Sequence, residues 1–171
     1  MRSALIPLVM AGTLLTGCAT TSANEPGSPP TALKPFTTDG CSMFPDRSAA
    51  MKADWCHCCV VHDLAYWRGG TADARLSADR TLQACVLQAT NDQAFADLMF
   101  NGVRVGGGPG LPTPYRWGYG WPYGRGYKPL TPDEEAQAQE LEADYRSKHP
   151  TLPCPSAPAS SASAGAKTCT Q

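Results

Sequence analysis

Residues 58–66 read CCVVHDLAY, and they contain most of the residues on which the expected fold of this 171-residue chain depends. The surrounding segment, residues 54–67, has neither proline nor glycine, and a pair of glycines follows soon after it. Cys58, His62 and Tyr66 recur every four residues, which predicts a helix with all three on one face.

A second amphipathic helix is predicted after the glycine pair. Thr71 is a suitable N-cap, and apolar residues follow at helical spacing to about Ala89. Asp79 lies within this apolar stripe. A buried carboxylate is costly unless a donor pairs with it, so we expect a donor on the facing helix, and His62 is the candidate.

Three further segments complete the expected domain. Residues 92–102 predict a short third helix. Residues 106–128 are rich in Gly, Pro, Tyr, Trp and Arg, and any sheet is expected to be a short hairpin there. Residues 131–134 combine an N-cap, an N1 proline and an acidic first turn, so a polar helix is expected over about 132–148.

The N-terminal segment has the pattern of an export signal. Residues 1–17 contain a basic residue and then an apolar stretch that is too short to span a bilayer. Residues 15–18, Leu-Thr-Gly-Cys, resemble the lipobox of bacterial lipoproteins. We therefore expect a signal peptide over 1–17, a lipidated Cys18 and a lipid-anchored protein in the cell envelope. Ala19 at the next position resembles lipoproteins sent to the outer membrane.

The composition of the chain limits the domain organisation and the partners that are expected after Cys18. Residues 18–34 predict a flexible tether and residues 151–171 a disordered tail, which leaves one domain over 35–150. The net charge is −1 and no run of Lys or Arg is present, which argues against a nucleic-acid partner. Eight cysteines in an exported chain favour disulfides.

The residues around His62 resemble the secreted phospholipase A2 family. Residues 58–66 match its Cys-Cys-x-x-His-Asp-x-Cys-Tyr signature, except that Ala65 replaces the last cysteine. In that family an antiparallel second helix supplies an Asp to the histidine and, six residues later, a Cys to the first Cys of the pair. Asp79 and Cys85 have this spacing, and both pairings agree with one helix register to within about half a turn.

The resemblance implies a mostly α fold of phospholipase A2 type. Two antiparallel helices would be linked by a Cys58–Cys85 disulfide, with a Gly/Tyr/Trp-rich loop region and a C-terminal helix beside them. A second disulfide, Cys41–Cys59, would tie the calcium loop to the first helix. The remaining cysteines stay open: either Cys56 pairs with Cys154 or Cys169, or those two pair with each other.

The resemblance also implies an activity, the Ca²⁺-dependent hydrolysis of an acyl ester of glycerophospholipids in a membrane. His62 would be the general base, because imidazole titrates near neutral pH. Asp79 would fix its tautomer and stabilise the imidazolium, with Tyr66 hydrogen-bonded to Asp79. Ca²⁺ prefers carboxylate and carbonyl oxygens. The residues implied for its site are Asp39, Gly40 and Asp63.

Other interpretations remain open. Only Gly40 precedes Cys41 where the animal family has a glycine-rich loop, which favours a non-catalytic module that binds lipid, calcium or an envelope partner. A structural envelope lipoprotein is a third possibility. Residues 56–59 with His62 could form a zinc or copper site, although adjacent helical positions point about 100° apart. The aromatic run over 115–127 is either a membrane-interface element or a surface loop that wraps the core. Headgroup, acyl position and protein partners are not specified.

Overall fold

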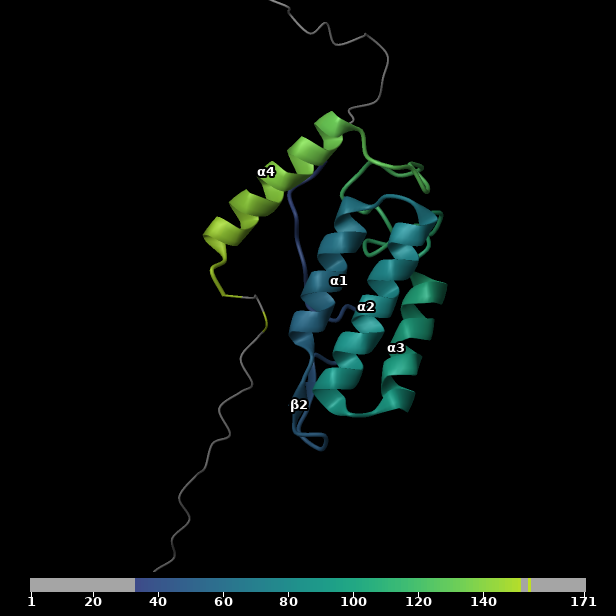
Figure 1. Cartoon of the computed structure of the whole chain (residues 1–171), viewed down its shortest axis with the longest axis vertical. Helices are drawn as coiled ribbons and strands as arrows, with labels where there is room; N and C mark the ends of the chain where they lie inside the picture. The colour runs from purple at the N-terminus through teal and green to yellow at the C-terminus, as the bar shows by residue number, and fades with distance from the viewer. Residues whose placement is uncertain (1–32, 152–153, 155–171) are drawn as a thin grey trace, which may run out of the picture.

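The computed structural model describes residues 33–151 and residue 154. The expected signal peptide, Cys18, most of the tether and Cys169 lie outside the described residues. Within the described part the fold is mostly helical, with four helices and one two-stranded antiparallel sheet (Figure 1). The elements are β1 (Arg47–Ser48), β2 (Ala53–Asp54), α1 (Cys56–Arg68), α2 (Ala72–Thr90), α3 (Gln93–Gly106) and α4 (Pro132–Lys148).

Helices α1, α2 and α3 pack together, successive helices run antiparallel, and α2 contacts both of its neighbours (Figure 1). The predicted caps are confirmed. Thr71 Oγ1 accepts a hydrogen bond from Ala74 N at 3.1 Å, and Thr131 and Glu134 form a capping box at the start of α4. These local signals explain why α2 and α4 begin where the sequence predicts.

The small sheet is not where the sequence analysis expected it. The prediction of a hairpin within residues 106–128 is wrong, since the described chain has its only strands at 47–48 and 53–54. This hairpin directly precedes α1, and Trp55 N donates to Asp46 O at 2.9 Å. Lys52 makes the turn with a φ of 51°, a left-handed conformation for which a lysine gives no sequence signal.

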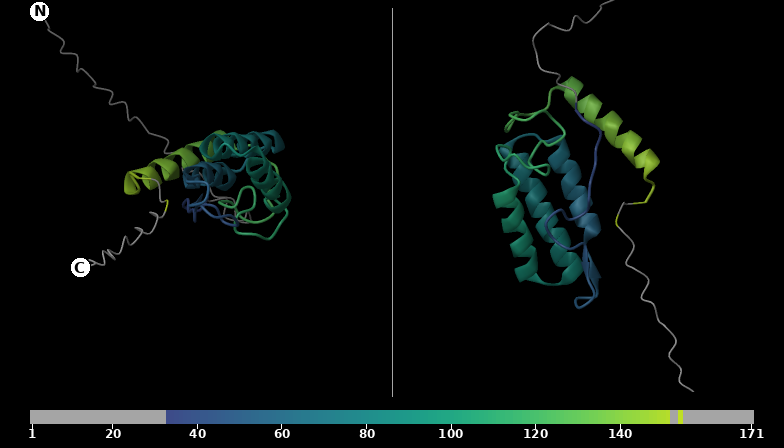
Figure 2. Two further views of the ribbon diagram at one scale, coloured as in Figure 1. Left: turned by 90° about the horizontal axis from the view of Figure 1, so that it is seen from below. Right: turned by 180° about the vertical axis from the view of Figure 1, so that it is seen from behind.

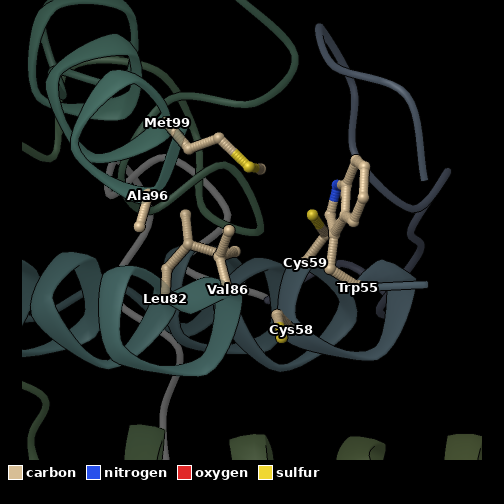
Figure 3. Close-up of a cluster of buried hydrophobic side chains, with 7 residues drawn as sticks. All are labelled: Trp55, Cys58, Cys59, Leu82, Val86, Ala96 and Met99. Atoms are coloured by element: carbon tan, nitrogen blue, oxygen red, sulfur yellow. The ribbon is translucent and has the colours of Figure 1, made fainter. Parts of the chain in front are cut away.

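The core has two parts. The first lies among α1, α2 and α3 (Figure 3), and Met51 and Ala53 of the hairpin pack against it. Its buried members are Trp55, Cys58, Cys59, Leu82, Val86, Ala96 and Met99. The second is formed where the extended segment after residue 33 runs between α1 and α4 (Figures 1 and 2). Its buried members are Leu33, Phe36, Trp67, Trp121 and Ala138.

The glycine- and aromatic-rich segment covers the end of α1 in the form of a loop. Trp117 and Trp121 are buried, and their indole nitrogens donate to the carbonyls of Gly70 and Arg68 at 3.0 and 2.7 Å. The bond to Arg68 satisfies a carbonyl that the end of α1 leaves free, and the bond to Gly70 ties the loop to the turn between α1 and α2. Of the two interpretations of this run, the loop that wraps the core is therefore correct for both tryptophans.

Three disulfides join the described elements. Cys58–Cys85 links α1 to α2 and Cys41–Cys59 links the preceding loop to α1, as the resemblance implied. The third bridge, Cys56–Cys154, selects one of the pairings that the sequence left open. Of the helices within 33–151, none is long and apolar enough to cross a membrane.

Candidate active site

His62 and Asp79 face each other across the α1–α2 contact. His62 Nε2 lies 2.9 Å from Asp79 Oδ1, and the two residues are only 7% and 0% exposed. The Cys58–Cys85 bridge, one turn from His62 on α1, fixes the register of the two helices. His62, the donor that the sequence predicts for the buried carboxylate, is therefore confirmed as one of its partners.

The hydrogen bonds around Asp79 determine which nitrogen of His62 is protonated. Burial by itself would raise the pKa of Asp79, but hydrogen bonds from His62, Arg104 and Tyr66 hold it below its usual value. Because the carboxylate is ionised, Nε2 must carry the proton that it shares with Oδ1. Nδ1 then bears a lone pair, and within the described residues it has no hydrogen-bond partner. His62 can thus accept a proton through Nδ1.

Tyr66 takes the place that the resemblance implied. Its hydroxyl donates to Asp79 Oδ1 at 2.7 Å, so both donors on this oxygen come from α1. Burial, together with the charge of Asp79, raises the pKa of the Tyr66 phenol, which therefore remains a donor at neutral pH.

Two arginines near Asp79 were not identified from the sequence. Arg104 Nη1 lies 2.6 Å from Asp79 Oδ2, and Arg75 Nε lies 3.9 Å from the same oxygen. Arg75 and Asp79 are four residues apart on α2, a spacing that could have indicated the pair. Arg104 is near the end of α3, and no local pattern connects it with Asp79.

A cavity of about 600 Å³ extends from His62. Most of its lining is apolar, and His62 and Asp63 are among its few ionisable side chains. Three apolar side chains of the lining are strongly exposed, which we call the apolar rim: Met43, Leu98 and Val105 are 74%, 57% and 81% exposed. The cavity therefore offers an apolar ligand a route from the surface to His62.

Asp63 of α1, next to His62, and Asp39 of the preceding loop are neighbouring carboxylates. Burial and the nearby charge of Asp39 raise the pKa of Asp63 to about 7, although Thr38 Oγ1 donates to Asp63 Oδ2 at 2.6 Å and opposes the rise. Across the described chain, neither carboxylate forms an ion pair with Lys or Arg. Asp39 and Asp63 also line one cavity of about 260 Å³, which shares Asp63 with the larger one. Carboxylate oxygens of this kind are ligands that a hard divalent cation would use.

Gly40 belongs to the same loop. It has a φ of 81°, and a Cβ there would lie 2.4 Å from Asp46 Oδ1. Asp46 Oδ1 accepts from Cys41 N at 2.9 Å, which holds the loop against the Cys41–Cys59 bridge. Only glycine fits this turn, which brings the backbone of Gly40 to the wall of the larger cavity.

The soft-metal interpretation of residues 56–59 is wrong for this state of the protein. The cysteines of this stretch are bonded to three different partners, and His62 is bonded to Asp79. His57 Nε2 lies 3.4 Å from the sulfurs of Cys58 and Cys85, but a disulfide sulfur is not the thiolate that binds zinc or copper.

The described residues singled out from the sequence thus form two adjoining groups. The first is His62, Asp79 and Tyr66, and the second is Asp39, Gly40 and Asp63. The first group contains a histidine whose Nδ1 has no partner among the described residues, and the second contains two carboxylates without a Lys or Arg partner there. Comparisons with protein-family models, curated proteins and solved structures found no match to this chain.

Proposed function

We propose that this chain is a phospholipase A2-like carboxylic ester hydrolase that cleaves an acyl ester of glycerophospholipids with the help of Ca²⁺. One observation carries the proposal. His62 lines an apolar cavity next to Asp63, with Nε2 bonded to Asp79 and Nδ1 without a protein partner. Such a hydrolysis requires a base in a defined tautomer, a site for a cation and an apolar surface against which an acyl chain can lie.

In the proposed reaction His62 Nδ1 takes a proton from a water molecule as that water attacks the ester carbonyl. Asp79 stabilises the imidazolium that forms, and Tyr66 helps to hold the carboxylate in place. His62 then returns the proton to the oxygen of the leaving lysophospholipid, and the fatty acid departs. Ca²⁺ bound by Asp39, Asp63 and the Gly40 carbonyl would supply positive charge for the oxyanion and the substrate phosphate.

The apolar rim and the expected N-terminus suggest how a lipid reaches the site. A lipid on Cys18 and a tether over 18–34 would hold the domain at a membrane of the bacterial envelope, which we propose to be the outer membrane. The apolar rim would contact the acyl layer, from which one chain can enter the cavity. Membrane attachment and substrate supply would then occur at the same surface.

The alternative is a non-catalytic module that binds a lipid chain. The cavity and the apolar rim support this alternative, because lipid binding requires neither the His62–Asp79 pair nor a cation. In that case the buried His62–Asp79 pair would serve only to join α1 and α2.

The deciding experiment measures fatty-acid release from mixed phospholipid vesicles by the chain lacking residues 1–18, which removes the expected lipid anchor, with Ca²⁺ and with chelator. The hydrolase requires Ca²⁺, loses activity in His62→Gln, and keeps it in His57→Gln, which changes an exposed histidine of the same helix. Absence of release by folded, disulfide-bonded protein that still binds the vesicles would refute the hydrolase and favour the lipid-binding module.

A further inference from the structure

Asp79 is held on both of its oxygens. Oδ1 accepts from His62 Nε2 at 2.9 Å and from Tyr66 OH at 2.7 Å. Oδ2 accepts from Arg104 Nη1 at 2.6 Å. The donors therefore come from two helices, α1 and α3, while the carboxylate itself belongs to α2. A carboxylate bonded on both sides cannot rotate about its terminal torsion without losing a charge-assisted hydrogen bond.

The second arginine holds Arg104 in place. Arg75 is 3% exposed and donates to the carbonyls of Val103 and Arg104 at 2.8 and 2.9 Å. Its Nε donates to Tyr66 OH at 3.0 Å, and its Nη1 donates to Tyr127 OH at 2.7 Å. Arg75 thus joins α2 to the last turn of α3, where Arg104 begins its reach toward Asp79. Its direct contact with Asp79 is longer, at 3.9 Å.

We propose that Arg104 is a positioning residue for the His62–Asp79 pair. By holding Oδ2, it keeps Oδ1 aimed at Nε2 and so maintains the tautomer in which Nδ1 is the base. This inference rests on the proposed hydrolase function, but the positioning itself is a property of the pair and can be measured without substrate.

The charges around Asp79 show that Arg104 does more than neutralise this buried carboxylate. Its facing ionisable groups are His62 and Tyr66 from α1, Arg75 from α2 and Arg104 from α3. If Arg104 is neutralised, Arg75 still opposes the buried charge, so the fold should survive. The part that is lost is the short, directional bond to Oδ2, and a displacement of about 1 Å at a reacting group can reduce the rate about a hundredfold.

The test compares Arg104→Gln with Arg80→Gln, an exposed arginine of α2 outside this network. We expect Arg104→Gln to lower kcat for vesicle hydrolysis by about tenfold to a hundredfold and to leave KM within about twofold. Arg104→Lys keeps the charge without the planar guanidinium, so it should recover part of the loss. Arg80→Gln should match the wild type.

Histidine ¹⁵N NMR gives the second readout, which needs no activity. The wild type should show His62 protonated at Nε2 and unprotonated at Nδ1, whereas Arg104→Gln should show a mixture of tautomers. A single unchanged tautomer, or a kcat within twofold of wild type, would overturn the proposal. If the wild type hydrolyses no lipid, the proposed function is refuted. The His62 tautomers measured by NMR still test the positioning role of Arg104. If Arg104→Gln does not fold, Arg104→Lys takes its place in the test. A wild-type kcat and a wild-type His62 tautomer in Arg104→Lys would then refute the proposal.

Discussion

Replacing Asp63 with Asn tests the cation site while leaving the His62–Asp79 pair intact. The change removes a charge but keeps the shape of the side chain, and the amide oxygen can still accept the hydrogen bond from Thr38. Without a cation, the ionised Asp63 is a partly buried charge next to Asp39 that no Lys or Arg compensates in the described structure. We therefore expect Asp63→Asn to stabilise the protein in chelator and to abolish its stabilisation by Ca²⁺.

The magnitude follows from the pKa of Asp63, which rises from 3.8 to about 7 on folding. At about 1.4 kcal/mol per pKa unit, the ionised side chain lowers the free energy of unfolding by at most about 4 kcal/mol above pH 7. Solvent near the partly exposed carboxylate screens this effect, so a gain of about 1–3 kcal/mol is expected for Asp63→Asn at pH 8.

The pH dependence has a definite sign. Below about pH 4, Asp63 is protonated in both the folded and the unfolded chain and contributes no difference. Between about pH 4 and 7 the unfolded chain loses the proton first, so the wild type loses stability as the pH rises through this range. Ca²⁺ must displace the same proton, so its apparent affinity should rise up to about pH 7 and then level off.

Urea unfolding with the disulfides intact, at pH 5 and pH 8, with Ca²⁺ and with chelator, measures all of these effects. At a hundred times its Kd, Ca²⁺ should stabilise the wild type by about 2.7 kcal/mol and Asp63→Asn by nearly nothing. Asp73→Asn, in the exposed first turn of α2, is the matched control and should keep the Ca²⁺ response. A less stable Asp63→Asn in chelator at pH 8, or one that Ca²⁺ stabilises as fully as the wild type, would refute the reasoning.

The remaining predictions concern the membrane surface, the packing of the site and a helix cap. Val105→Asp should weaken vesicle binding at least tenfold without altering hydrolysis of a soluble short-chain ester, because it charges the apolar rim; Val61→Asp, an exposed valine outside the cavity, should bind normally. Gly107→Ala should lower both kcat and the free energy of unfolding, the latter by about 1–3 kcal/mol, because its Cβ would lie 2.5 Å from the Tyr66 ring. An unchanged urea midpoint would contradict this packing. Thr71→Ala should cost about 1 kcal/mol of stability and leave the ester hydrolysis rate unchanged, since its hydroxyl only caps α2. A lower rate of ester hydrolysis in a folded Thr71→Ala variant would show that Thr71 affects the reaction as well as capping α2.

Much of the fold could be predicted because the signals are local. Helical spacing, the threonine caps and the acidic first turn depend on residues within a few positions of one another, and they located α1, α2 and α4 to within about two residues. The pairing of His62 with Asp79 was also accessible, since a lone carboxylate in an apolar stripe demands a partner.

The end of α3 and the turn of the hairpin were harder to predict from the sequence. The structure extends α3 to Gly106, four residues beyond the prediction, and Arg75 of α2 donates to the carbonyls of Val103 and Arg104 in this last turn. The hairpin before α1 depends on Lys52 in a left-handed conformation, which propensity alone would assign to glycine or asparagine.

The sequence by itself determined the helices, the buried dyad and the presence of disulfides, because periodicity, caps and cysteine content are properties of short segments. Only the tertiary structure decided that Arg104 reaches Asp79, that Cys56 pairs with Cys154 and that Trp117 and Trp121 are buried. Each of these contacts joins residues that are remote along the chain. Their formation depends on how whole helices and loops pack, and no spacing within a single segment encodes it.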